Sequence, residues 1–308
     1  MAEEPLAAVP ARVIERLGAA RGFVLDLDGT LVLGDRRNRG FAPLPGALAL
    51  TRLLARRQVP YVVFTNGTTQ TPRQYAAALR RSGFELDAGQ VLTPVVSALD
   101  VLTRRRQARV MVLGTDGLTG PLADAGLEVL PPAGQVKVDA VLVGWYREFT
   151  MDALEAACHA VWGGAACYTC SSSVFFATAE GKVMTTSRAI AAMVRSMTGC
   201  RVEVVGKPSL QALRTAGRRL GAALRELAVV GDDPELEVPM AHRGGSLAVA
   251  VASGVAGADE FARLPARRRP HLSVHGVDQL LALYEEACRR ADGGGSKGLS
   301  PPRRPAGA

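Results

Sequence analysis

Aromatic residues are few in this chain of 308 residues, at 5% of the total, with five tyrosines and two tryptophans. No tyrosine or tryptophan lies among the clustered arginines, although the formal charge of the chain is +8. Binding of single-stranded nucleic acid needs aromatic side chains placed among basic ones. We therefore expect no nucleic-acid partner. A basic surface also attracts small anions, and that use fits this composition better.

Long hydrophobic runs are missing too, since no apolar stretch approaches the roughly 18–20 residues that a membrane span needs. The chain begins with Glu3 and Glu4 where a secretory signal would carry basic residues. Five cysteines are an odd number, and the Cys167-x-x-Cys170 spacing has no second pair to complete a zinc site. We expect a cytoplasmic protein with no membrane partner and no disulfide framework.

Most of the chain alternates strand-like and helix-like segments. Continuous apolar runs of four or five residues suit buried parallel strands, and the segments between them have helical patterning. This alternation predicts an α/β fold with a doubly wound parallel sheet. The expected strands lie at 23–25, 61–64, 110–113, 140–143, 202–205, 227–230 and 247–251. The expected helices lie at 46–57, 72–82, 94–106, 151–161, 187–197, 208–220 and 277–290.

Two pairs of acidic residues follow predicted strands. The first strand ends in Asp26-Leu27-Asp28-Gly29-Thr30, and a later one in Gly231-Asp232-Asp233-Pro234. Acids at strand ends are also ordinary turn formers. Adjacent acids repel each other unless a cation lies between them, and Mg²⁺ takes oxygen ligands of this kind.

Two further polar segments follow predicted strands between these acid pairs. Thr65-Asn66-Gly67 offers a hydroxyl, an amide and an open backbone to a phosphate, although Asn-Gly is also a common turn. Gly206-Lys207-Pro208 holds one of only four lysines, against 33 arginines. A lysine there could be an ordinary surface residue, but a compact ammonium also suits a phosphate site. Ligands of open α/β sheets bind at the carboxyl ends of the strands, so all four segments together predict one phosphate site.

These four segments resemble the motifs of the haloacid dehalogenase-like (HAD) phosphatase superfamily. Further similarity, to the nitrophenylphosphatase/NagD-like branch, extends from about Arg21 to Leu283 and includes Val143-Gly144-Trp145 and Phe176-Ala177-Thr178. The resemblance implies a HAD-like Rossmannoid core at 1–85 and 185–290, with an inserted α/β cap at 86–184. We expect residues 291–308 to be a disordered tail. Relatives in this branch often dimerise through their caps, which makes a homodimer possible.

The resemblance also implies a Mg²⁺-dependent phosphatase that hydrolyses small phosphate monoesters of metabolites through an aspartyl-phosphate. Asp26 would be the nucleophile, and Asp28 the general acid and base. Thr65, the backbone of Asn66 and Lys207 would bind the phosphoryl group. Asp26, the backbone carbonyl of Asp28 and Asp232 would hold the metal ion.

Two departures from the branch pattern affect the site. Glu237 stands where relatives usually have a second aspartate, so we expect Glu237 or Asp233 to complete the outer shell of the metal. Thr169-Cys170-Ser171-Ser172 replaces a common cap motif, Thr-Asn-x-Asp. Because the cap chooses the leaving group, the particular substrate does not follow from the resemblance.

Other functions stay open at this point. A non-catalytic phosphate-binding or regulatory protein could keep the same fold, although it has little use for a nucleophile beside an acid. A nucleotide-binding oxidoreductase would need Gly-x-Gly-x-x-Gly after its first strand, where this chain has its acid pair. A receiver-type phosphoacceptor would share the acids and the lysine but would lack the large insert.

Overall fold

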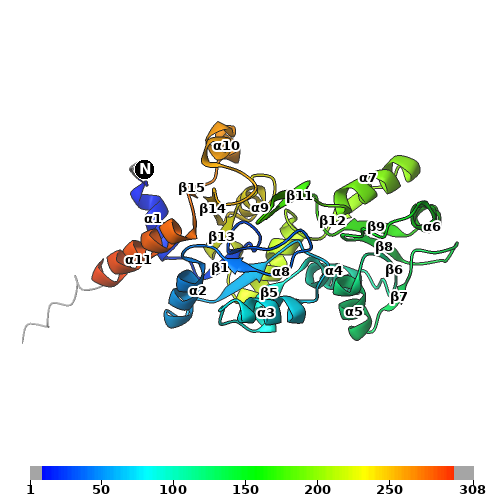
Figure 1. Ribbon diagram of the computed structural model, residues 1–308, viewed down its shortest axis with the longest axis horizontal. Coiled ribbons are helices and arrows are strands. Elements are labelled where there is room, and N and C mark those ends of the chain that lie inside the picture. The colour runs from blue at the N-terminus through cyan, green and yellow to red at the C-terminus, as the bar shows by residue number, and fades with distance from the viewer. Residues whose placement is uncertain (1–8, 295–308) are drawn as a thin grey trace, which may run out of the picture.

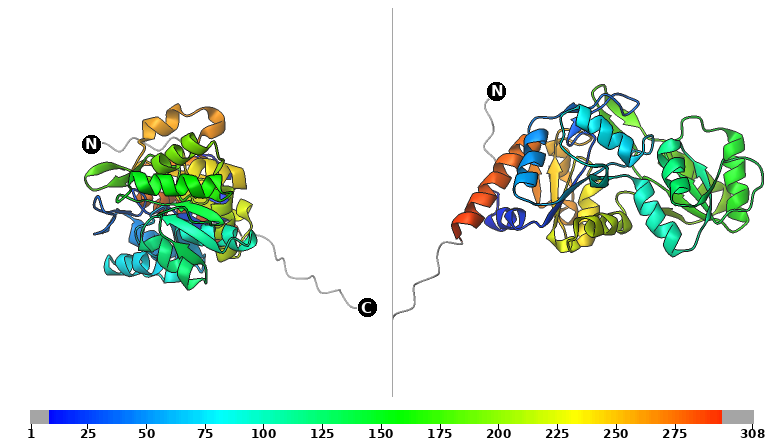
Figure 2. Two further views of the ribbon diagram at one scale, coloured as in Figure 1. Left: turned by 90° about the vertical axis from the view of Figure 1, so that its right-hand side faces the viewer. Right: turned by 90° about the horizontal axis from the view of Figure 1, so that it is seen from below.

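Two parallel β-sheets, each covered by helices on both faces, organise the computed structural model, which describes residues 9–294 (Figure 1). They form two lobes that lie side by side along the long axis of the molecule, as the view from below also shows (Figure 2). The predicted α/β class, with a doubly wound sheet and a second α/β domain, is confirmed. We call the larger lobe the core and the smaller one the cap.

The core sheet has six parallel strands in the order β15-β14-β13-β1-β4-β5. Its central strands are buried on both faces, as their continuous apolar sequences require. In chain order these strands are β1 (Gly22–Leu25), β4 (Tyr61–Phe64), β5 (Val91–Leu92), β13 (Leu227–Gly231), β14 (Leu247–Val251) and β15 (Leu272–Val274).

Helices pack on both faces of the core sheet and bury its apolar side chains in two clusters. On one face lie α1 (Ala11–Gly18), α2 (Ala47–Arg56), α3 (Pro72–Arg81) and α11 (Val277–Gly294). On the other face lie α8 (Leu210–Leu220), α9 (Glu237–Gly244) and α10 (Ala258–Arg263).

The cap sheet has five parallel strands in the order β12-β9-β8-β6-β7. Helices α6 and α7 cover one face, and α4 and α5 cover the other. The strands are β6 (Arg109–Leu113), β7 (Glu128–Leu130), β8 (Ala140–Val143), β9 (Ala166–Thr169) and β12 (Val202–Val204). The helices are α4 (Pro94–Arg104), α5 (Asp116–Asp124), α6 (Met151–Trp162) and α7 (Ser187–Thr198).

The limits of the cap differ from those predicted at both ends. The prediction began the cap at residue 86, but β5 pairs with β4 in the core sheet, so the chain leaves the core just after β5. The prediction ended the cap at residue 184, yet α7 packs on α6 and β12 pairs with β9. The expected core strand at 202–205 is therefore the edge strand of the cap, and the chain returns to the core between β12 and α8. An apolar run predicts a strand but not the sheet that it joins.

Two antiparallel hairpins lie where the lobes meet. The strands β10 (Phe175–Thr178) and β11 (Gly181–Met184) form a hairpin of the cap, and β2 (Val32–Leu33) pairs with β3 (Ala42–Pro43) in the core. A bridge between Gly34 and Thr178 joins the two hairpins, and the amide of Ala179 donates to the carbonyl of Gly34 at 2.9 Å. The cap hairpin is thus tied to the core.

The predicted disordered tail is wrong over its first residues, because α11 continues to Gly294. Asp292 of this helix forms an ion pair with Arg57 at 2.9 Å, which fixes the extra turn against the core. Residues 295–308 of the predicted tail lie outside the described residues. None of the helices within 9–294 is long and apolar enough to cross a membrane.

Candidate active site

The predicted site residues converge on one cavity between the core and the cap. Asp26, Asp28, Asn66, Lys207, Asp232 and Asp233 all line it. They come from the carboxyl ends of β1, β4 and β13 and from the return segment between β12 and α8. The free volume inside is about 60 Å³, which is room for a few water molecules or one small group.

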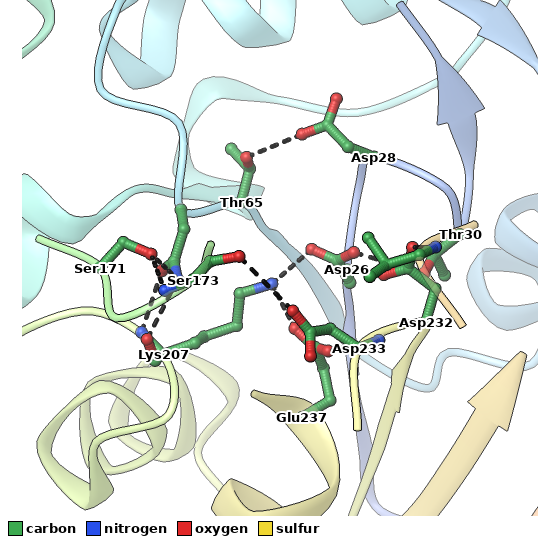
Figure 3. Close-up of polar contacts among 12 residues, drawn as sticks. Asp26, Asp28, Thr30, Thr65, Ser171, Ser173, Lys207, Asp232, Asp233 and Glu237 are labelled. Carbon is green, nitrogen blue, oxygen red and sulfur yellow. Dashed lines mark hydrogen bonds and ion pairs between the residues drawn. The ribbon is translucent and has the colours of Figure 1, made fainter. Parts of the chain in front are cut away.

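Asp26 and Lys207 form a buried ion pair at the centre of this cavity (Figure 3). Lys207 Nζ contacts Asp26 Oδ1, and it lies 2.6 Å from Glu237 Oε1 on its other side. The lysine is 1% exposed, so its charge is scarcely screened by solvent. Burial alone would lower the pKa of Lys207, but the two carboxylates raise it above its ordinary value, so the side chain stays an ammonium.

Asn66 holds the backbone of Lys207 in place. Its Nδ2 donates to the carbonyl oxygen of Lys207 at 3.0 Å, and its Oδ1 accepts from the Lys207 amide at 2.9 Å. Asn66 Nδ2 also donates to Ser171 Oγ of the cap at 3.0 Å. The phosphate-binding role predicted for Asn66 belongs to its backbone, so these side-chain contacts do not oppose it, and that role stays a prediction.

Asp28 lies on the other side of Asp26 and next to Thr65 (Figure 3). Thr65 Oγ1 donates to Asp28 Oδ2 at 3.2 Å and accepts from the amide of Gly67 at 2.9 Å. Asp28 Oδ1 has no hydrogen-bond partner among residues 9–294. Burial, reinforced by the nearby charge of Asp26, raises the pKa of Asp28 to about 7, against the lowering effects of Thr65 and Lys207. This carboxyl group can therefore hold a proton near neutral pH.

Asp232 and Asp233 follow β13 and complete the acidic wall. Asp232 Oδ2 accepts from the amide of Val255 at 2.6 Å, and Asp233 Oδ1 accepts from the amide of Glu235 at 2.8 Å. A Cβ on Gly29 or Gly254 would clash with the Asp232 carboxylate. Glycines at those two positions thus allow the backbone to approach this acid closely.

Four buried carboxylates line this cavity, and a fifth, that of Glu237, contacts the single ammonium from its other side. Asp26, Asp28, Asp232, Asp233 and Glu237 are each at most 8% exposed, and Lys207 is the one buried lysine or arginine in the described part of the chain. Burial, with repulsion from Asp26 and Glu237, raises the pKa of Asp232 well above its ordinary value. Such an excess of negative charge on oxygen donors fits a divalent cation of the Mg²⁺ type.

Within residues 9–294, no three His, Cys, Asp or Glu side chains are arranged as a metal cage. The predicted ligand set does not need one, because it combines two carboxylates with the backbone carbonyl of Asp28. Open sites of this kind are usual for Mg²⁺, which keeps several of its waters. Glu237, predicted as an outer-shell partner of the metal, contacts Lys207.

The cap supplies much of the remaining cavity lining, most of which the sequence analysis did not assign. Trp145, which follows β8, is buried and lines the cavity. The loop before the cap hairpin and the hairpin itself add further residues, and Asn38 comes from the core loop after β2. Only the approach of the two lobes brings these segments together, so no local pattern marks them. The additional cap residues are Ser171, Ser173, Phe175, Phe176, Thr185 and Ser187.

Comparison with known proteins agrees with this arrangement. A family model of haloacid dehalogenase-like hydrolases matches residues 23–128, and a second model, of HAD-hydrolase-like proteins, matches residues 204–280. Together the two models cover more than half of the chain. The chain belongs to the HAD-like hydrolases.

Named relatives narrow the class to phosphatases. Chronophin of Mus musculus is 29% identical over 283 residues, which span 88% of this chain and 95% of that protein. Dihydroxyacetone phosphatase of Corynebacterium glutamicum is 26% identical over 265 residues, which span 86% and 92%. The crystal structure of 4-nitrophenylphosphatase from Thermotoga maritima has the same fold, with a TM-score of 0.78 at 23% identity over 87% of this chain and 99% of that one. The predicted resemblance to the nitrophenylphosphatase/NagD-like branch is confirmed by a double mutant of the thermostable NPPase from Geobacillus stearothermophilus, whose structure matches with a TM-score of 0.73 at 26% identity over 84% of this chain and 97% of that one.

Proposed function

We propose that this protein hydrolyses small phosphate monoesters by transferring the phosphoryl group to Asp26 and then to water. The observation that carries the proposal is the buried ion pair between Asp26 and Lys207 in a cavity that two lobes enclose. A carboxylate is a recognised nucleophile for phosphoryl transfer. A fixed ammonium beside it lowers the repulsion between that carboxylate and an anionic substrate.

Two proton transfers complete the reaction, and Asp28 is placed for both. When an oxygen of Asp26 attacks phosphorus, the ester P–O bond breaks and the departing alcohol oxygen takes the proton of Asp28. Asp28 then accepts a proton from water as that water attacks the aspartyl-phosphate, which releases inorganic phosphate and restores Asp26. Asp28 Oδ1 supports this role because it is buried and free of partners within residues 9–294.

Mg²⁺ is the proposed cofactor, held by the carboxylates of Asp26 and Asp232 and the backbone carbonyl of Asp28. When bound, it would neutralise charge on the phosphoryl oxygens. Thr65 supports Asp28 through its hydroxyl group, and Asn66 supports Lys207 through both of its amide atoms. Asp233 and Glu237 add negative charge around the lysine and the metal position.

The substrate class follows from the size of the cavity and from the relatives. The free volume near Asp26 suits one group of the size of a phosphoryl group. Relatives named dihydroxyacetone phosphatase and acid sugar phosphatase support a small phosphorylated metabolite. The five cysteines are all free, as is usual in a reducing compartment, so we propose that the protein acts in the cytoplasm. A homodimer through the cap stays a prediction.

Release of phosphate from an aryl phosphate tests the proposal. We expect turnover that needs Mg²⁺, stops in excess chelator and returns when the metal is restored. Asp26→Asn should lower the rate by at least about 1,000-fold, because it removes the nucleophile. Asp259→Asn is the matched control, since Asp259 is exposed on α10. Equal rates for the two variants would instead favour a phosphate-binding protein without catalysis at Asp26. Full activity in chelator would contradict the metal-dependent mechanism.

A further inference from the structure

The loop that follows β4 is held by the cap as well as by the core. Residues 65–71 form this loop, and they include Thr65 and Asn66, which support Asp28 and Lys207. Three neighbouring strands of the cap sheet, β6, β8 and β9, each lead directly to a residue that contacts the loop. Ligands of open α/β sheets bind at the carboxyl ends of the strands, and at this end of the cap sheet a loop of the core is bound.

Thr68 makes two of these three contacts. Its Oγ1 accepts from the backbone amide of Trp145 at 2.8 Å, and its carbonyl oxygen accepts from Thr115 Oγ1 at 3.1 Å. The third contact joins Asn66 Nδ2 to Ser171 Oγ. Thr68 is 1% exposed, so a hydrogen bond that is lost here is not replaced by one to bulk water.

Two glycines of the cap let its backbone approach Thr68 closely. A Cβ on Gly117 would lie 2.3 Å from the carbonyl oxygen of Thr68 and 2.7 Å from the amide nitrogen of Gln70. A Cβ on Gly144 would lie 3.0 Å from Thr68 Oγ1. These glycines belong to two separate segments of the cap, one after β6 and one after β8. The cap is therefore fitted to the core at both polar groups of Thr68 that accept a hydrogen bond.

Thr68 does not line the active-site cavity, so it has no part in the chemistry itself. It lies three residues after Thr65, whose hydroxyl group accepts from the Gly67 amide at 2.9 Å. The same hydroxyl group donates to Asp28 at 3.2 Å (Figure 3). This short turn links the position of Thr68 to that of the Thr65 hydroxyl group. We propose that Thr68 is a positioning residue, which docks the cap on the loop and thereby holds Thr65 against Asp28.

This inference rests on the proposed phosphatase activity, and paired substitutions of one residue test it. Thr68→Val removes the hydroxyl group and keeps the shape of the side chain, whereas Thr68→Ser keeps the hydroxyl group. With an aryl phosphate, Thr68→Val should lower kcat by at least about tenfold, because small displacements of catalytic groups are costly. Thr68→Ser should restore kcat to within about threefold of the wild type. In both variants KM should change by less than about threefold, because Thr68 does not touch the substrate.

Thr215→Val is the matched control, because it removes another buried hydroxyl group that joins the two lobes. Thr215 of α8 donates to Asp100 Oδ2 of α4 at 2.5 Å, and neither residue lines the cavity or belongs to the loop 65–71. Thr215→Val should lower the melting temperature about as much as Thr68→Val does, yet leave kcat within about twofold of the wild type. Equal kcat values for the two variants would overturn the inference, because Thr68 would then only stabilise the fold.

The fluorescence of Trp145 reports whether the cap stays docked, with no need for turnover. The chain has two tryptophans, and Trp162→Phe leaves the buried Trp145 as the only one. In that background Thr68→Val should raise the quenching of Trp145 by acrylamide at least about twofold, because local opening exposes the ring. Thr68→Ser and Thr215→Val should leave the quenching unchanged. Unchanged quenching in Thr68→Val would overturn the inference and leave the phosphatase proposal standing.

A second variant decides the matter if Thr68→Val does not fold. Thr115→Val removes the other hydrogen bond from the cap to Thr68 and should lower kcat by about threefold or more. A kcat of Thr115→Val equal to that of the wild type would overturn the inference. A folded wild-type protein that turns over no aryl phosphate would overturn the phosphatase proposal, and with it the role of Thr68 in positioning Thr65 for catalysis.

Discussion

The side-chain amide of Asn66 binds both backbone polar groups of Lys207, accepting from its N–H at 2.9 Å and donating to its C=O at 3.0 Å. Asn66 follows a core strand, whereas Lys207 follows the edge strand of the cap sheet. This double contact sets the position of the ammonium relative to Asp26. The same contact holds Lys207, which follows a strand of the cap, to the core.

Asn66→Ala should therefore lower both activity and stability. Two hydrogen bonds are lost and two buried backbone groups lose their partner, which costs about 2 kcal/mol of the free energy of unfolding. A small displacement of Lys207 should lower kcat by roughly 10–100-fold. Asn66→Asp keeps the acceptor for the Lys207 N–H, so its kcat should lie between that of the wild type and that of Asn66→Ala. An Asn66→Ala enzyme with unchanged kcat would show that the lysine does not depend on this contact.

Much of the fold and site could be predicted because the signals are local. Each predicted polar segment directly follows an apolar strand, and the carboxyl ends of neighbouring parallel strands meet at one edge of a sheet. Asp26, Asn66 and Asp232 reach the cavity in that way. The predicted helices are all observed, within a few residues at their ends.

The rest depends on contacts between distant segments. Val202–Val204 has the composition of a core strand, and only its pairing with β9 places it in the cap. Glu237 replaces a shorter acid, and its contact with Lys207 follows from where α9 begins on the core. Asn38 and Trp145 meet the cavity only because the lobes close over it. None of these relationships has a sequence pattern of its own.

Glu237→Gln tests the contact of Glu237 with Lys207. The change removes a buried negative partner of the ammonium, which keeps Asp26, so the free energy of unfolding should fall by about 1–3 kcal/mol. Lys207 would then pair more strongly with Asp26, which should weaken the nucleophile and lower kcat by about tenfold. Glu235→Gln is the matched control two residues away, because Glu235 pairs with Arg268 in an exposed ion pair. That control should change stability by less than about 0.5 kcal/mol, and an equal effect of the two variants would contradict the assignment.

His271 should make the stability of the core depend on pH. Its Nδ1 accepts from the amide of Ala248 at 2.9 Å, which requires the neutral ring. Burial, with the charges of Arg16 and His242, lowers the pKa of His271 to about 4, from an ordinary value of 6.5. As the pH falls, His271 therefore takes up its proton in the unfolded chain before it does so in the folded one. The stability that His271 contributes is present above pH 6.5 and is lost as the pH falls toward 4.

Denaturant unfolding at pH 7 and at pH 4.5 measures this effect. We expect His271→Asn to lose less stability than the wild type between the two values, because the asparagine oxygen can accept the same bond without titrating. His275→Asn, at an exposed position in the next turn, is the control and should match the wild type. Identical pH dependence in all three proteins would remove His271 as the source.

The direct test of the account is the identity of the group that carries the phosphoryl intermediate. Asp28→Asn should slow the attack of water on that intermediate, so acid-quenched Asp28→Asn enzyme incubated with Mg²⁺ and an activated aryl phosphate should accumulate it. Peptide mass spectrometry should then find one phosphoryl group on the peptide that contains Asp26, and none in Asp26→Asn. A phosphoryl group on any other residue, or rapid turnover by Asp26→Asn without a modified peptide, would contradict the role of Asp26 as nucleophile.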